Sequence, residues 1–255
     1  MPPIITLLTD FGERDGYVAQ MKGVILSICP SAVLVDITHE IAAQDVEGGA
    51  YVLAQTVGRF PAGTIHVGVV DPGVGTARRG MAMTSGGQFF VGPDNGLFSF
   101  AWADEARAFE IVPDASASPH LSRPRSLRTR RRAPRRRRTA ESFGTEFRNP
   151  VLLETWAKTL VGDLATGRVL HTDRFGNVIT NFRPEDFGGA PPSFALPTRS
   201  VPDDLPVVRT FGDVPAGKAC WMIGSGGYFE LAVNGGSAAA RFAVERGDPV
   251  HARRR

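Results

Sequence analysis

The chain has 255 residues, of which 42% are hydrophobic and 22% charged, enough for one large folded domain or two smaller ones. No apolar run approaches the roughly 20 residues of a membrane span, and the first residues lack the basic start and cleavage site of a signal peptide. We therefore expect a cytoplasmic protein with no membrane partner. Cys29 and Cys220 lie far apart without metal-ligand spacing, so we expect two free thiols.

The net charge of +3 comes from one segment, residues 118–141, which contains ten arginines. Without those ten, 19 of the 29 basic residues remain against 26 acidic ones, a net charge of −7. A face that binds nucleic acid usually spreads its basic residues over several elements and adds aromatic side chains for stacking. The segment has no aromatic residue between His120 and Thr139, so we expect no nucleic-acid partner. A disordered nucleic-acid arm and a genuine basic linker remain alternatives for this segment.

The first part of the chain alternates strand patterns with helix patterns. The predicted elements, in order, are a strand ending at Asp10, a helix over 16–29, a strand over 32–38, a helix over 46–60, a strand and Gly-rich turn over 64–75, and a strand, turn and short helix over 87–102. This alternation predicts an α/β domain with a mostly parallel sheet covered on both faces, assigned to residues 1–160. Ligands of such sheets bind beyond the carboxyl ends of the strands.

After about residue 160 the pattern changes to short alternating strands separated by Gly, Asp and Pro turns. The change predicts a second, smaller all-β domain over residues 161–255, resembling a β-barrel.

Two turns that follow predicted strands carry carboxylates. Asp10 and Asp15 flank a glycine after the first strand, and Asp71 is followed seven residues later by Arg78. Carboxylates at strand ends can bind sugar hydroxyls, whereas an Asp in a turn can also simply cap its own backbone. Two such turns after parallel strands favour a binding or catalytic role.

Other motifs point to no cofactor and no metal. The turn Gly-Pro-Asp-Asn-Gly-Leu at 92–97 consists of standard turn formers, and the Gly-Ser-Gly-Gly run at 224–227 precedes a strand pattern, which excludes a dinucleotide fingerprint. His39, His66 and Asp71 show no recognisable ligand spacing, so structural histidines are expected.

Several of these stretches together resemble the S-adenosyl-L-methionine (SAM) hydrolase family, also called SAM hydroxide adenosyltransferases, which is similar in fold to SAM-dependent fluorinases and chlorinases. The stretches are TDFG-x₂-DGYVAQMKGVI, VDITHEI, FPAGTIHVGVVDPGVGT-x-R, GPDNGL, DRFGNVITN and SGGYFELAVN. The resemblance covers nearly the whole chain except residues 118–140. It implies an N-terminal α/β domain, a C-terminal β-barrel, SAM as substrate without a cofactor, and a homotrimer with active sites between subunits.

The resemblance also implies roles for individual residues. Asp10 would hold the ribose hydroxyls, and Asp15, Gly16 and Tyr17 would line the substrate pocket. Contacts to the adenine and methionine ends would come from Asp173, Asn177, Ser225, Val233, Asn234 and Gly235. Asp71 and Arg78 match two of the three catalytic residues and would orient and activate the attacking water. The similar halogenases lack the Asp found here at position 71, so hydrolysis is favoured, with SAM-dependent halogenation as the alternative.

The third catalytic residue of the family is a His in the motif Thr-Phe-His-Gly-Arg-Asp-(Leu/Ile)-Phe-Ala-Pro, which is absent. At this place the chain reads HLSRPRSLRT, residues 120–129. The string CAC CTT TCA CGG CCG CGA TCT CTT CGC ACC C encodes these residues, and from its second base it encodes the family motif with Leu. We therefore interpret the Arg-rich segment as a compensated frameshift and expect residues 118–140 to be exposed and irregular. A catalytically impaired SAM or adenosine binder is the corresponding alternative function.

Overall fold

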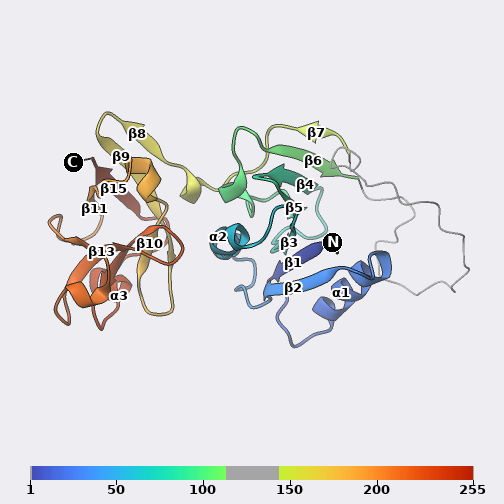
Figure 1. The fold of residues 1–255 in the computed structure, drawn as a ribbon, viewed down its shortest axis with the longest axis horizontal. Helices are drawn as coiled ribbons and strands as arrows, with labels where there is room; N and C mark the ends of the chain where they lie inside the picture. The colour runs from blue at the N-terminus through green and yellow to red at the C-terminus, as the bar shows by residue number, and fades with distance from the viewer. Residues whose placement is uncertain (1, 113–143, 255) are drawn as a thin grey trace, which may run out of the picture.

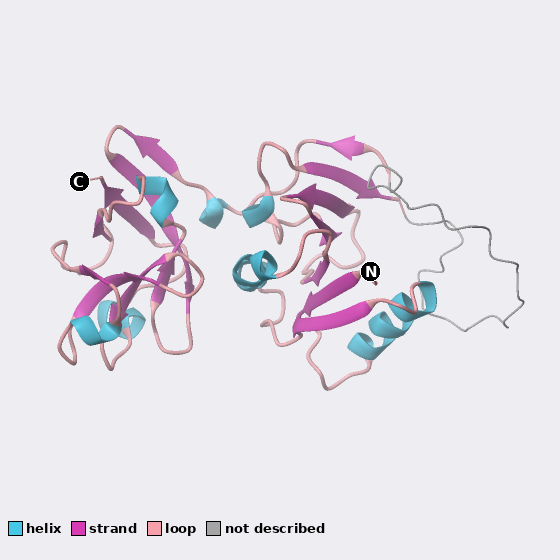
Figure 2. Cartoon of the chain, viewed as in Figure 1, coloured by secondary structure: helices cyan, strands magenta, loops and turns pink. Residues whose placement is uncertain are grey.

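The computed structural model describes residues 2–112 and 144–254, which form two parts that lie side by side, each built on a curled sheet (Figure 1, Figure 2). The elements of the first part are β1 (Ile4–Thr9), α1 (Tyr17–Ile28), β2 (Val33–Thr38), α2 (Val46–Thr56), η1 (Val57–Arg59), β3 (Ile65–Val69), β4 (Gly80–Ser85), β5 (Gln88–Pro93), η2 (Ser99–Ala101), β6 (Arg107–Ile111) and β7 (Glu146–Phe147).

The first sheet has seven strands in the order β2-β1-β3-β5-β4-β6-β7. The pairs from β2 to β5 are parallel, and those from β5 to β7 are antiparallel. The predicted α/β class is confirmed, although the parallel pairing is limited to one half of the sheet. The sheet is therefore more mixed than the mostly parallel sheet expected from the sequence.

A tight hairpin accounts for this difference. Gly86 and Gly87, with φ of 55° and 74°, are the only residues between β4 and β5. Positive φ at both positions is the geometry of a type I′ two-residue turn, whose backbone twist matches the right-handed twist of the flanking strands. The turn therefore places β4 antiparallel to β5, and β4 then pairs with β6.

The two long helices differ in how deeply they are buried. The Asp45 carboxylate accepts a hydrogen bond of 2.9 Å from the Gly48 amide and so caps the start of α2. Gly49 of α2 lies so close to the sheet that an added Cβ would come within 2.9 Å of Leu97. In α1, by contrast, no residue is buried, so its apolar residues remain at least partly exposed.

The second part contains mainly short strands. Its elements are η4 (Glu154–Trp156), β8 (Thr159–Val161), β9 (Leu164–Thr172), β10 (Val178–Thr180), η5 (Pro184–Phe187), β11 (Ser193–Ala195), β12 (Val207–Val208), η6 (Phe211–Asp213), β13 (Ala219–Ile223), β14 (Phe229–Val233), α3 (Ala238–Phe242) and β15 (Pro249–Arg253). They form an eight-stranded sheet in the order β11-β15-β9-β10-β14-β13-β12, with β8 beside β9. Over residues 144–254 its end strands β11 and β12 are not paired with each other, so the sheet curls without closing into a hydrogen-bonded barrel.

Aromatic side chains fill the core of this second sheet. The rings of Phe194 and Trp221 stack with centroids 4.2 Å apart, and Phe229 packs beside Phe194 with centroids 5.0 Å apart. Trp221 and Phe229 are almost completely buried. Large aromatic rings contribute much apolar area, so this cluster stabilises a sheet of short strands.

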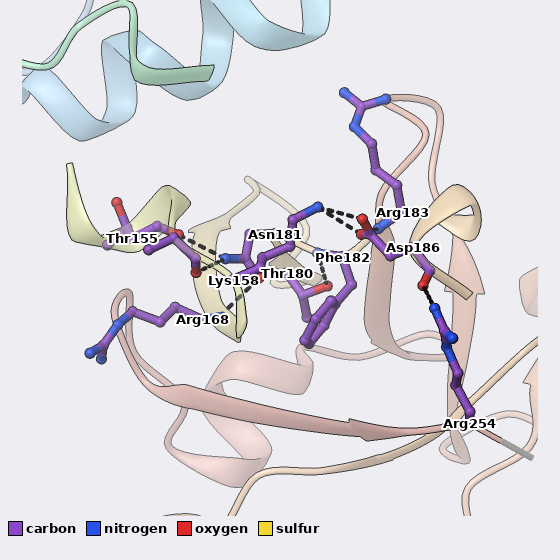
Figure 3. A network of polar contacts seen from close by, with 10 residues as sticks. Thr155, Lys158, Arg168, Thr180, Asn181, Phe182, Arg183, Asp186 and Arg254 are labelled. Atoms are coloured by element: carbon purple, nitrogen blue, oxygen red, sulfur yellow. Dashed lines mark hydrogen bonds and ion pairs between the residues drawn. The ribbon is translucent and has the colours of Figure 1, made fainter. Parts of the chain in front are cut away.

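The two parts meet where α2 packs against β9. The Tyr51 ring stacks on the His171 ring with centroids 4.3 Å apart, and Arg246 forms an ion pair with Asp45 at the start of α2. The connecting segment is fixed to the second sheet by Asn181, whose side-chain amide donates to the carbonyls of Thr155 and Ala157 at 3.1 and 2.8 Å (Figure 3).

No helix in residues 2–112 or 144–254 is long and apolar enough to cross a membrane. The expectation that residues 118–140 are irregular and exposed falls outside the described residues.

Candidate active site

Asp71 and Arg78 face each other across the turn that follows β3. Arg78 forms an ion pair with Asp71, whose carboxylate also accepts a hydrogen bond of 2.9 Å from the Gly73 amide. The side chain of Arg78 is 26% exposed and that of Asp71 is 15% exposed, so the pair is reachable from solvent yet partly shielded. The arrangement presents a fixed guanidinium and a fixed carboxylate at a strand end, which suits orientation of a polar substrate or water.

Gly73 makes this pairing sterically possible. A Cβ added at Gly73 would overlap the guanidinium of Arg78, lying 2.6 Å from its Cζ atom. The glycine in this turn therefore leaves the space that the arginine fills.

Asp10 reaches the same edge of the sheet. β1 and β3 are adjacent and parallel, with Thr9 opposite Val69, so Asp10 and Asp71 follow the carboxyl ends of neighbouring strands. One Asp10 oxygen accepts a hydrogen bond of 2.8 Å from the Gln44 amide. Its other oxygen has no hydrogen bond or ion pair within residues 2–112 and 144–254.

Asp15, Gly16 and Tyr17 lie at the start of α1 and are exposed. Tyr17 packs against Phe11, with ring centroids 6.0 Å apart. These residues therefore lie in the same loop as Asp10, which runs from the end of β1 to the start of α1.

The Gly-Pro-Asp-Asn-Gly-Leu turn has a structural role, as expected. Asp94 is buried, pairs with Arg79 through a 2.7 Å contact, and accepts the Val151 amide at 2.8 Å. The Asn95 side-chain amide donates to the Val70 carbonyl at 2.7 Å. Asn95 therefore holds the strand end that precedes Asp71.

Replacing Asp94 with Ala is expected to destabilise the protein by about 2–4 kcal/mol, because the Val151 amide and the Arg79 guanidinium would lose their buried acceptor. Urea unfolding followed by circular dichroism measures the effect. The exposed Asp104→Ala is the matched control and should change the free energy of unfolding by less than about 0.5 kcal/mol. Equal stability of the two variants would contradict the structural role of Asp94.

The histidines of this part lie in polar networks within the sheet. His66 contacts the Thr6 hydroxyl at 2.7 Å and the Gln88 side chain at 2.6 Å, and His39 contacts the Thr9 hydroxyl at 2.8 Å. Burial lowers the pKa of His66, and its hydrogen bond to Gln88 opposes that effect. Within the described ranges, no three His, Cys, Asp or Glu residues are placed to hold a metal ion.

The second part contains a cavity of about 810 Å³. It is lined by the six residues that the family resemblance places at the adenine and methionine ends of the substrate: Asp173, Asn177, Ser225, Val233, Asn234 and Gly235. The β9–β10 turn, the β13–β14 turn and the turn that follows β14 thus bring to one cavity two groups of residues that are at least 48 sequence positions apart.

Three of these residues are held by hydrogen bonds, Asp173 and Asn177 within their own turn and Asn234 to a separate loop. The Asp173 carboxylate accepts hydrogen bonds from the amides of Phe175 and Asn177 and from the Asn177 side chain, each 2.9 Å long. The Asn234 side chain donates to the Val214 carbonyl at 2.7 Å. Ser225, in contrast, is exposed at the cavity.

Six further residues that line this cavity were not predicted from the sequence: Phe175, Phe211, Met222, Gly224, Glu230 and Gly236. Phe175 is 65% exposed although it is a large aromatic, so much of its ring is accessible at the cavity. The available signals were a Phe inside the turn Asp-Arg-Phe-Gly-Asn and a Glu inside the apolar strand Phe-Glu-Leu-Ala-Val.

The residues predicted in the first part do not line this cavity, whose walls come from residues 173–236. The nearest contribution of the first part is a smaller adjoining cavity of about 170 Å³, where Tyr51 and Gln55 of α2 join Asp173, Ser225 and Glu230. The structure therefore presents the predicted residues as two groups, one at the strand ends of the first sheet and one around the large cavity.

Comparison with known proteins assigns both parts of the chain to one family. Models of the N- and C-terminal domains of SAM hydroxide adenosyltransferases match residues 5–129 and 167–251. A protein from Thermus thermophilus named (R)-S-adenosyl-L-methionine hydrolase is 37% identical over 96% of this chain and 98% of its own length. A hydrolase of the same name from Salinispora arenicola is 38% identical over 97% of both, whereas a fluorinase from an Actinoplanes species is 28% identical over 96% of this chain and 95% of its own.

Solved structures agree with these matches. A conserved hypothetical protein from Thermus thermophilus superposes with a TM-score of 0.72 at 35% identity, over 99% of this chain and all of that one. An uncharacterised conserved protein from Thermotoga maritima gives a TM-score of 0.74 at 27% identity, over 98% and 100%. The chain therefore belongs to the SAM hydroxide adenosyltransferase family.

Proposed function

We propose that this protein hydrolyses SAM to adenosine and L-methionine. The observation that carries the proposal is the cavity of about 810 Å³ lined by the six residues that the family resemblance assigns to the adenine and methionine ends of SAM. The relatives at 36–38% identity are named (R)-S-adenosyl-L-methionine hydrolase, and the fluorinases are more distant at 26–28%.

The reaction needs positioning more than bond activation in the substrate. The oxygen of water forms a bond to the 5′ carbon, the bond from that carbon to sulfur breaks with its electrons staying on sulfur, and one proton leaves the water. Methionine departs as a neutral thioether. The enzyme must therefore hold water in line with the carbon–sulfur bond and assist loss of its proton.

In this proposal Arg78 and Asp71 perform that task. The guanidinium favours the developing hydroxide, and the carboxylate orients the water while it anchors Arg78 through their ion pair. A halide ion is already an anion and needs no such help, so the pair favours hydrolysis over halogenation.

We further propose that the protein works in the cytoplasm as a homotrimer, without a metal or cofactor. Asp71 and Arg78 are absent from the walls of the large cavity, and an adjacent subunit that supplies its strand-end residues would complete the site. Light scattering coupled to gel filtration measures the subunit number, and a monomer of full activity would contradict the shared site.

Incubation of the purified chain with SAM tests the activity. We expect adenosine and L-methionine to appear slowly and in equal amounts, also in the presence of EDTA, because positioning alone supplies part of the rate enhancement. Liquid chromatography quantifies both products, and Asp71→Ala is the control that should remove the enzymatic rate. Release of 5′-methylthioadenosine instead of adenosine would contradict hydrolysis at the 5′ carbon.

A second candidate function is binding of SAM or adenosine without turnover. It is favoured by one observation, the absence of the family His motif from residues 120–129. Calorimetry with adenosine and SAM, combined with the product assay, separates the two functions: tight binding without products supports the binder.

A further inference from the structure

Glu230 occupies a central position at the candidate substrate site. It lies on β14 opposite Met222 of β13 and Ile179 of β10, and it lines both the large cavity and the smaller adjoining one. Its neighbours along the strand, Phe229 and Leu231, point into the aromatic core because successive side chains of a strand alternate between faces. Glu230 is therefore a carboxylate in an otherwise apolar strand, facing the cavities.

The Glu230 carboxyl has no hydrogen bond or ion pair with any described residue. The other carboxylate of the site, that of Asp173, already accepts three hydrogen bonds from its own turn. Space for Glu230 is provided by Gly224, where an added Cβ would overlap the carboxyl and lie 2.7 Å from its Cδ atom. The site thus holds one carboxylate that is structurally engaged and one whose acceptor positions are open.

The surroundings of Glu230 disfavour its charge when the cavity is empty. Burial, assisted by the negative charge of Asp173, raises the pKa of Glu230 to about 7. The other titratable groups near it stay protonated and neutral at pH 7, because burial raises the pKa of Tyr51, Tyr228 and Cys220. A half-buried carboxylate without a partner is costly, and such costs are typical of sites that bind a ligand of opposite charge.

We propose that the Glu230 carboxylate receives a positively charged group of the methionine portion of SAM, which makes Glu230 a specificity-determining residue. This inference rests on the proposed function. SAM carries two such groups, the α-ammonium and the sulfonium, whereas the adenosine portion carries none. Glu230 would then discriminate the cationic substrate from neutral nucleosides that share its adenine and ribose.

Calorimetry with four ligands tests the inference, in an Asp71→Ala background that prevents turnover. S-adenosylhomocysteine carries only the ammonium, 5′-deoxy-5′-(dimethylsulfonio)adenosine only the sulfonium, SAM both, and adenosine neither. Glu230→Gln is expected to lower the affinity for SAM about 10- to 100-fold, which is the effect of losing one charged hydrogen-bond partner. The affinity for adenosine should stay within about 2-fold of its value before the substitution. One of the two ligands with a single cation should lose affinity by the same factor as SAM. The cation of that ligand is the group that Glu230 binds.

The pH dependence provides an independent readout. A cation binds better to ionised Glu230, so affinity for the sensitive ligand should rise as pH increases from 5.5 to 8 and should be flat in Glu230→Gln. The exposed Glu245→Gln is the matched control and should behave as the parent. Gly224→Ala displaces the Glu230 carboxyl and should therefore lower the affinity for cationic ligands in the same way as Glu230→Gln.

The outcomes separate this inference from the proposed function. If the parent chain binds neither adenosine nor SAM while folded, the proposed function itself fails. A different outcome is that the parent chain binds both ligands, while Glu230→Gln lowers the affinity for adenosine as much as that for SAM, or changes neither affinity. In either case Glu230 is not the residue that recognises the cation.

Discussion

A chain in which residues 120–129 are replaced by Thr-Phe-His-Gly-Arg-Asp-Leu-Phe-Ala-Pro is expected to hydrolyse SAM about 10²–10⁴ times faster than the present sequence. The physical reason is proton transfer. Asp71 and Arg78 can orient water and stabilise hydroxide, an imidazole can in addition accept the proton of the water, and general-base assistance has this magnitude. Initial rates of adenosine formation at saturating SAM measure the change.

The control for this comparison is the same ten-residue replacement with alanine in place of its histidine. If the gain comes from the imidazole, the alanine form should retain SAM binding and lose most of the added rate. Equal rates for the two replacements would show that the segment acts through folding or substrate closure, which would contradict the role assigned to the histidine.

The restored chain should also keep its preference for water over halide. With Asp71 and Arg78 in place, 5′-chloro-5′-deoxyadenosine should form more slowly than adenosine even at high chloride concentration, because the carboxylate repels an anionic nucleophile. Faster formation of the chlorinated product would favour the halogenase alternative.

The genetic explanation of the Arg-rich segment can be checked directly. The match to the N-terminal family model ends at residue 129 and the C-terminal match begins at residue 167, so seven of the ten arginines lie between the matched ranges. The nucleotide sequence of codons 113–142 should contain the family motif in a neighbouring frame. Codons that encode no such motif would leave the genuine basic linker as the explanation.

The elements that the sequence predicted well are those whose periodicity is set by burial. A strand ending at Asp10 and a helix over 46–60 were expected from the spacing of apolar residues, and the structure has β1 at Ile4–Thr9 and α2 at Val46–Thr56. The strands β4 and β6 were not predicted, and neither was the Gly86–Gly87 turn that orients β4. Pairing order in a mixed sheet depends on such turns rather than on strand composition.

The candidate site shows the same division. Asp71 and Arg78 could be proposed from their position after a strand, and the residues of the large cavity were available only through the family resemblance. Glu230 escaped notice because one charged residue in an apolar strand is usually a solvent-facing position, and only the fold shows that this face lines a cavity.

Gly73→Ala is expected to reduce SAM hydrolysis about 10²–10³-fold in the restored chain while leaving SAM affinity within a few fold. The added Cβ would overlap the Arg78 guanidinium, so the arginine must leave its ion pair with Asp71. Loss of one fixed group that stabilises developing charge typically has this cost.

The matched control is Val74→Ala, which shortens an exposed side chain in the same turn and leaves the ion pair untouched. Kinetics under saturating and limiting SAM separate kcat from KM, and the effect should lie in kcat because the pair acts on the attacking water rather than on the bound substrate. A Gly73→Ala protein that retains full kcat would show that the guanidinium can move without cost. Water activation would then have to come from groups other than Asp71 and Arg78.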